Sequence, residues 1–150
     1  MEIDYDALMT GLQAAIPFNN HLGIKYLELG SGRAVAELPT EPHLMNHVGT
    51  QHAGGLFSVA EAASGGAFLA AFADLMGSIM PLAESAEISY KKIAQGPIRA
   101  IATFSSDQEV LRKQLDEDGR IRFPVEVELQ DGDGQTVAEV TVRWYVKKLG

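Results

Sequence analysis

The most constraining feature of the sequence is a long segment, from His52 to about Met76, that is apolar or small on every side. Glu61 is the only charge between Ala53 and Ala73. A helix of this composition is normally buried all round. A membrane span is the alternative, but Glu61, Asp74, four glycines and two serines argue against it. We therefore predict a buried central helix around which the rest of the chain folds.

Six further segments have the pattern of β-strands. Two of them precede the long helix and are joined by Gly30-Ser31-Gly32, whose glycines permit a tight reversal. Four follow the helix, and in the last two an apolar residue stands at every second position, as in half-buried strands. The predicted strands are 22–29, 33–38, 86–94, 98–105, 121–129 and 138–146.

Two shorter helices complete the pattern. One covers 5–16, with Asp4 or Asp6 as its cap and Pro17 as its end, and the other covers 107–118 and ends at a glycine. Because the later strands alternate, we predict an antiparallel sheet with one buried face. The long helix is the only element large enough to cover that face. The class is therefore α+β.

Composition narrows the classes of protein that fit. A chain of 150 residues with 46% hydrophobic content fits one globular domain, 1–150. The net charge of −8 argues against a nucleic-acid partner, since such binding rests on neutralising phosphates. The absence of cysteine excludes disulfides and thiolate chemistry. The acidic first residues do not resemble a secretory signal, so we expect a cytoplasmic protein.

Glu61 is a carboxylate in an otherwise apolar helix. Burying an ionised carboxylate without partners costs several kcal/mol, so the group has to be paired, hydrogen-bonded, protonated or next to a cavity. Each of these perturbs its pKa, and perturbed groups gather at functional sites. A structural hydrogen bond at a dimer contact, or a gap open to solvent, would explain it equally well.

The residues before Glu61 suit attack on a carbonyl. The segment 46–55 runs from a loop into the start of the helix. Backbone N–H groups in the first helical turn are unpaired and lie at the positive end of the helix dipole. Alanine or glycine there lets a ligand carbonyl approach the backbone, as in an oxyanion hole. A base two turns further along the same helix completes the set.

The segment 46–61 also resembles the signature of PaaI-like (phenylacetyl-CoA-type) thioesterases of the hotdog superfamily. The signature is Asn, two residues, Gly-Thr, one residue, His-Gly-Gly, and an acid nine residues after the histidine; here it reads Asn46-x-x-Gly49-Thr50-x-His52-Ala53-Gly54, with Glu61 as the acid. The resemblance implies a hotdog fold, an antiparallel six-stranded sheet wrapped around one long central helix. It also implies hydrolysis of acyl-CoA or acyl-carrier-protein thioesters, with coenzyme A only as part of the substrate.

The resemblance further implies a role for each matching residue. Glu61 would activate the hydrolytic water or attack the thioester directly. The N–H of Ala53, alone or with that of Gly54, would polarise the carbonyl. Asn46 would bind near that carbonyl or orient the water, and His52 would position the substrate. In this family the site forms across a homodimer or homotetramer, where the loop of one protomer faces the acid of another.

Two departures from the signature keep other functions open. The family more often has aspartate at the position of Glu61, and Ala53 replaces the first glycine of the usual pair. These changes motivate a second hypothesis, a non-catalytic module that binds acyl thioesters or a partner protein. A third is a hotdog dehydratase, which would use a histidine such as His52 and an acid in a different arrangement.

Further residues are candidates for substrate binding. Gly49 and Thr50 belong to the loop signature, Ser58 and Ser64 lie one turn on either side of Glu61, and Ser89 is a polar residue on the following strand. For the two serines of the helix, packing is the alternative role.

Lys91 and Lys92 are candidates for the phosphates of coenzyme A, and lysines that keep an edge strand soluble are the alternative. A metal site formed by His43, His47 and His52 is conceivable, but the first two lie in a loop without further clustered ligands, so we expect none. Four aromatic residues could either wall an acyl pocket or form core: Phe18, Phe57, Phe68 and Phe72.

Overall fold

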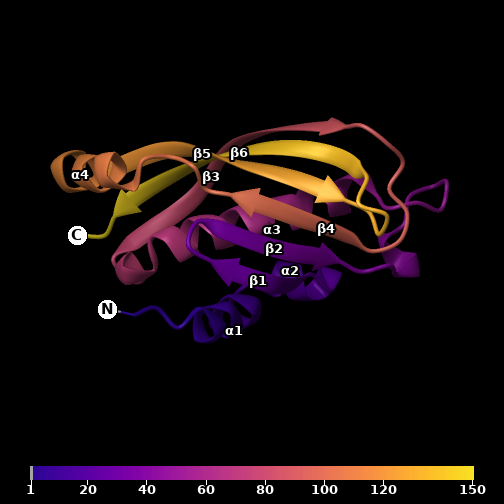
Figure 1. Ribbon diagram of the computed structural model, residues 1–150, viewed down its shortest axis with the longest axis horizontal. Coiled ribbons are helices and arrows are strands. Elements are labelled where there is room, and N and C mark those ends of the chain that lie inside the picture. The colour runs from indigo at the N-terminus through magenta and orange to yellow at the C-terminus, as the bar shows by residue number, and fades with distance from the viewer. Residues whose placement is uncertain (1) are drawn as a thin grey trace.

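The computed structural model describes residues 2–150 and confirms the predicted class (Figure 1). The helices are α1 (Tyr5–Ala15), α2 (Pro17–Leu22), α3 (Ala53–Ala71) and α4 (Gln108–Asp118), with 3₁₀ turns at Pro42–Leu44 and Ala73–Leu75. The strands are β1 (Lys25–Gly30), β2 (Arg33–Leu38), β3 (Ile79–Tyr90), β4 (Ile98–Thr103), β5 (Arg120–Gln130) and β6 (Thr136–Lys148). They form one antiparallel sheet in the order β1-β2-β4-β5-β6-β3.

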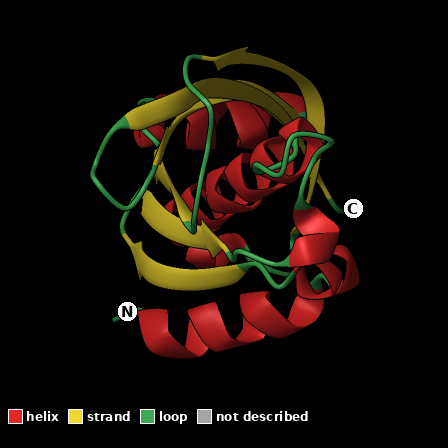
Figure 2. Ribbon diagram, turned by 90° about the vertical axis from the view of Figure 1, so that its right-hand side faces the viewer, coloured by secondary structure: helices red, strands yellow, loops and turns green. Residues whose placement is uncertain are grey.

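The sheet curves around α3, which is the core of the molecule (Figure 2). The small residues of α3 let the strands come close: a methyl group on Gly66 would lie 3.1 Å from the Cβ of Ala34 on β2. Phe68 of α3 packs on Phe123 of β5 with ring centroids 4.9 Å apart. The alternating residues of β5 and β6 are all buried, as predicted: Ile121, Phe123, Val125, Val127, Leu129, Ala138, Val140, Val142, Trp144 and Val146.

The two edges of the sheet differ. At the β1 edge, Gln13 of α1 hydrogen-bonds the strand backbone: its Nε2 donates to the carbonyl of Ile24 (2.8 Å) and its Oε1 accepts from the N–H of Tyr26 (2.8 Å). Within residues 2–150, β3 pairs only with β6. The outer side of this strand, 12 residues long, is therefore an open edge.

Several predicted boundaries are wrong, and the largest errors are at the first and third strands. In addition, α3 ends at Ala71 rather than near Met76, and β4 ends at Thr103 rather than at 105. The first strand begins at Lys25, not at 22, because residues 17–22 form α2. Pro17 does end α1, but its fixed φ also suits the first position of a helix, so a second helix starts there. Gly23 then closes α2 in the left-handed conformation, with φ of 75°.

The strand after α3 begins at Ile79, seven residues before the predicted start, and ends at Tyr90, four residues before the predicted end. A bulge between Ala83 and Ser85 shifts the alternation, and Pro81 interrupts the strand-like composition. Proline is tolerated there because β3 is the edge strand of the sheet formed by residues 2–150.

Candidate functional site

One face of α3 is not covered by the protein's own sheet. Gly54, Ser58, Glu61, Gly65 and Leu69 recur every three or four residues, and each is half-buried or exposed, whereas most of the helix is buried. This spacing places them in one stripe along the helix. Glu61, the single charge, therefore lies on the accessible face of α3.

Glu61 opens into a cavity of about 300 Å³. Burial raises the pKa of its carboxyl group above the ordinary glutamate value of 4.5. Within residues 2–150, no hydrogen bond or ion pair engages this carboxylate. The remaining lining is almost entirely apolar and comes from α1, β1, α3, β3 and β6: Leu12, Ile16, Tyr26, Ala62, Gly65, Phe68, Leu69, Pro81, Leu82, Ala83 and Trp144.

Tyr26 is the second polar side chain at this cavity, and the sequence patterns did not single it out. Its hydroxyl donates to the carbonyl of Ala62 at 2.9 Å. Burial raises the pKa of Tyr26, and the nearby charge of Glu61 raises it further. The side chain of Tyr26 therefore stays neutral. The sequence pattern placed Tyr26 on a strand but did not indicate that it lies beside Glu61.

Neither serine of the helix bonds the Glu61 carboxylate. Ser58 Oγ donates to the carbonyl of Gly54 (2.7 Å), and Ser64 Oγ donates to the main-chain carbonyl of Glu61 (2.7 Å). Ser64 Oγ also accepts from Trp144 Nε1 at 3.1 Å. Ser64 is fully buried, so this chain of bonds holds the Trp144 ring against the helical turn that carries Glu61.

The start of α3 offers fewer free donors than the signature implies. His52 is the N-cap, and its Nδ1 accepts from the N–H of Gly54 at 2.7 Å. The N–H of Leu56 donates to the carbonyl of His52 at 3.1 Å. Gly54 is therefore not available to polarise a carbonyl in this arrangement, whereas the exposed Ala53 has an N–H for which the described residues provide no acceptor. His52 acts first as a helix cap.

A second hollow, of about 520 Å³, lies at this start of α3. Phe57 and the exposed Phe18 line it, whereas Phe68 reaches the Glu61 cavity and Phe72 is core. The hollow is formed by α2, the 3₁₀ turn at 42–44 and the first turns of α3: Phe18, Leu22, His43, Leu44, Met45, His52, Gly54, Gly55, Phe57 and Ser58.

Asn46 shapes the loop that leads into α3. Its Oδ1 accepts from the N–H groups of Val48 and Thr50 (3.0 Å each), and its Nδ2 donates to Thr50 Oγ1 (2.8 Å) and the carbonyl of Gln51 (3.3 Å). Gly49 has φ of 78°, a conformation that favours glycine. All donor and acceptor positions of the Asn46 amide are thus used within the loop. The amide stabilises the loop and has none left for a hydrolytic water or a substrate carbonyl. Thr50, which is bonded to Asn46 through its N–H and its hydroxyl, is buried.

The remaining candidates lie away from Glu61. Ser89 pairs with Glu139 on β6, while its neighbour Ile88 pairs with the inward-facing Val140, so Ser89 points to the outer face of the sheet. It is not a neighbour of Glu61. Lys91 and Lys92 are exposed just after β3, where Lys92 Nζ donates to Gln135 Oε1 at 3.2 Å.

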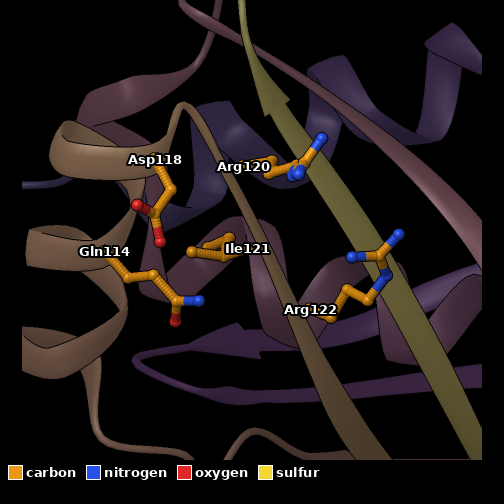
Figure 3. Close-up of a pocket in the computed structure, with 5 residues that line it drawn as sticks. All are labelled: Gln114, Asp118, Arg120, Ile121 and Arg122. Atoms are coloured by element: carbon orange, nitrogen blue, oxygen red, sulfur yellow. The ribbon is translucent and has the colours of Figure 1, made fainter.

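Another hollow, of about 410 Å³, lies between α4 and β5 (Figure 3). Gln114 and Asp118 come from α4, and Arg120 and Arg122 from the start of β5, on either side of Ile121. Arg122 Nε is paired with both carboxylate oxygens of Glu84 at 3.0 Å.

No cluster of three or more His, Cys, Asp or Glu suited to a metal occurs in residues 2–150. In the same range, no helix is long and apolar enough to cross a membrane.

Comparison with known proteins agrees with this architecture. The family model described as a domain of unknown function (DUF4442) matches residues 5–146. SSO2140 of Saccharolobus solfataricus, named as a candidate esterase, is 29% identical over 126 residues, which are 83% of this chain and 79% of that protein.

Solved structures give the fold its name. PA5026 from Pseudomonas aeruginosa, a protein of unknown function described as a probable thioesterase, superimposes with a TM-score of 0.85 at 24% identity and covers 99% of each chain. E. coli PaaI, from the phenylacetic acid degradation operon, gives a TM-score of 0.74 at 17% identity over 97% of this chain and 94% of its own. At these identities the likeness establishes the fold, the hotdog fold of PaaI-like proteins.

Proposed function

The chain belongs to the DUF4442 family, and on that premise we propose that it hydrolyses acyl thioesters of coenzyme A or acyl carrier protein, with Glu61 as the catalytic carboxylate. The observation that carries the proposal is the Glu61 carboxylate, which has no hydrogen-bond or ion-pair partner within residues 2–150 and lies at an apolar cavity on the accessible face of α3. A structural carboxylate would have partners, because burial without them is costly.

The cavity and the carboxylate suit the two parts of the substrate. The apolar lining accommodates an acyl chain, and the raised pKa makes Glu61 a stronger base. As a base, Glu61 accepts a proton from the water that attacks the thioester carbonyl. As a nucleophile, it forms an anhydride that water then cleaves. In both cases the C–S bond breaks, the thiol takes up a proton, and the acyl group leaves as a carboxylic acid.

The N–H of Ala53 is the proposed donor to the carbonyl oxygen, and it requires a second copy of the chain. Ala53 and Glu61 stand eight residues apart on one helix, so at 1.5 Å per residue they are about 12 Å apart along its axis. A base has to come within hydrogen-bonding distance of the reacting atoms. One protomer therefore does not place both groups on one thioester.

A two-fold pair resolves this separation. Joining two protomers through their open β3 edges would continue the sheet and leave no open edge at the join. A two-fold axis perpendicular to α3 makes the α3 helices of the two protomers antiparallel. If the α3 helices cross near Phe57, midway between Ala53 and Glu61, the Ala53 N–H of each protomer faces the Glu61 carboxylate of its partner. Lys91 and Lys92, exposed at the end of β3, are the candidates for the phosphates of coenzyme A.

The test is a thiol-release assay over a panel of acyl-CoAs. We expect the wild type to release free coenzyme A, and Glu61→Gln, which keeps the shape and removes the base, to lose at least about 100-fold in kcat. Glu87→Gln is the matched control, because Glu87 is exposed on the outer face of β3. Near wild-type turnover by Glu61→Gln would reject the assignment of Glu61.

A non-catalytic module that binds acyl thioesters is the second candidate. It is favoured by the His52 Nδ1 contact, which takes the Gly54 N–H and so removes one exposed donor from the start of α3. Tight binding of acyl-CoA without thiol release would support it. The same contact disfavours a dehydratase that uses His52 as its base, because a neutral imidazole that accepts at Nδ1 carries its proton on Nε2.

A further inference from the structure

Gly65 has no conformational or packing requirement for glycine. It lies in the interior of α3 without a positive φ, where alanine forms a more stable helix. A Cβ built on Gly65 would meet the ring of Trp144 at 3.5 Å, an ordinary contact. Gly66 is different: its Cβ would lie 3.1 Å from both Ala34 Cβ and Tyr26 Cε1. Close packing explains Gly66 and does not explain Gly65.

What Gly65 does is keep the Glu61 cavity open. It lines that cavity one helical turn after Glu61, and the Trp144 ring lies next to it. The Trp144 ring does not yield easily, because its Nε1 donates to the buried Ser64 hydroxyl at 3.1 Å. A side chain at position 65 would therefore extend beside the ring and narrow the cavity at this part of its wall.

We propose that Gly65 is a specificity-determining residue, whose missing side chain leaves room for an uncharged, apolar acyl chain in the cavity that Gly65 and Trp144 line. This inference rests on the proposed function, since it assigns the substrate class of the same site. No Lys, Arg or His lines the cavity among the described residues, and Glu61 would repel an acyl group with a second carboxylate. Acyl groups that reach past Glu61 need the space at Gly65, whereas the shortest ones do not.

Binding can be measured apart from turnover, because Trp144 is the only tryptophan of the chain. S-alkyl-CoA thioethers with propyl and octyl chains are not hydrolysed, and a chain that enters the cavity changes the fluorescence of Trp144. We expect Gly65→Ala to weaken binding of the octyl compound by about tenfold or more, the effect of one carbon in a tight apolar pocket. Binding of the propyl compound stays unchanged.

The matched control is Gly11→Ala, which makes the same change in α1 at a position where an added Cβ meets nothing within 4 Å. It should leave both affinities unchanged. Light scattering of Gly65→Ala distinguishes a role in subunit packing: a changed oligomeric state with equal losses for both compounds would overturn the proposal. So would an unchanged octyl-to-propyl ratio.

The outcomes separate the two proposals. If the octyl compound binds wild type, Gly65→Ala shifts the ratio as expected, and no acyl-CoA is hydrolysed, the assignment of Gly65 stands and hydrolysis fails. If hydrolysis is observed but the ratio does not shift, the assignment of Gly65 fails alone. The assignment of Gly65 would also be overturned if the octyl compound changed the Trp144 fluorescence of the wild type no more than coenzyme A alone does.

Discussion

Replacing Ala53 by proline removes one N–H group and little else. Ala53 is the first residue of α3, where proline's fixed φ suits the helix and the missing N–H breaks no helical bond. The preceding His52 has φ of −68° and ψ of 141°, the extended conformation that a residue before proline prefers. The side chain is exposed, so the ring has room. We expect an unchanged or slightly raised Tm.

The expected loss of activity follows from the number of donors at the start of α3. The N–H of Gly54 is held by His52 Nδ1 at 2.7 Å and that of Leu56 by the His52 carbonyl at 3.1 Å, while Gly55 is buried. Among the described residues, Ala53 is then the exposed first-turn residue whose N–H has no acceptor. Losing one oxyanion donor lowers kcat by about 100- to 1,000-fold, or about 2.7–4 kcal/mol.

The assay compares kcat and KM for thiol release with the Tm and the far-UV circular dichroism spectrum. Ala53→Ser is the control, because it adds an atom and keeps the N–H; it should retain activity. Full activity of Ala53→Pro would refute the reasoning that this N–H polarises the carbonyl. A folded but inactive protein with unchanged binding of a thioether would support it.

Mixing two inactive variants tests whether the site spans two copies. After unfolding and refolding together, Glu61→Gln and Ala53→Pro chains pair at random, so half of the dimers are mixed. Each mixed dimer has one composite site with both native groups, so about a quarter of wild-type activity returns. No recovery, with mixed dimers shown to form, would contradict a site shared between protomers.

Other predictions follow from burial and packing. Because the folded-state pKa of Glu61 is raised, its ionised form opposes folding, and this penalty is absent well below pH 4.5 and develops as the pH rises above that value. Glu61→Gln should therefore be more stable than wild type at pH 7 in a denaturant titration. Wild-type kcat should rise with pH through the raised pKa of Glu61. An equal stability of the two proteins at pH 7 would contradict this. Ser64→Ala leaves the buried Trp144 Nε1 unpaired and should cost about 1–3 kcal/mol of unfolding free energy by urea titration; a loss below the error of the titration would argue against the bond. Gly66→Ala should cost about 1–3 kcal/mol through overpacking against Ala34, and a stabilised variant would show that the strand yields.

The sequence was most informative where a pattern is local and repeated. The alternation in β5 and β6 identified their buried faces, and the composition of α3 identified it as the core helix with Glu61 as its one charge. Such periods depend only on backbone geometry, since side chains alternate across a strand and recur every 3.6 residues on a helix. Length and cap residues likewise placed α1 and α4, with Asp4 and Gly119 at the expected ends.

Tertiary structure decided everything that depends on which groups meet. The bulge and Pro81 obscured the first half of β3, and the pairing with β6 turned Ser89 to the outer face. The amide of Asn46 found its partners inside its own loop, and His52 Nδ1 captured the Gly54 N–H. A donor or acceptor has several partners within reach along the chain, and only the folded geometry selects one. The cavity beside Glu61 depends on residues brought together from five elements, and no period in the sequence brings those five together.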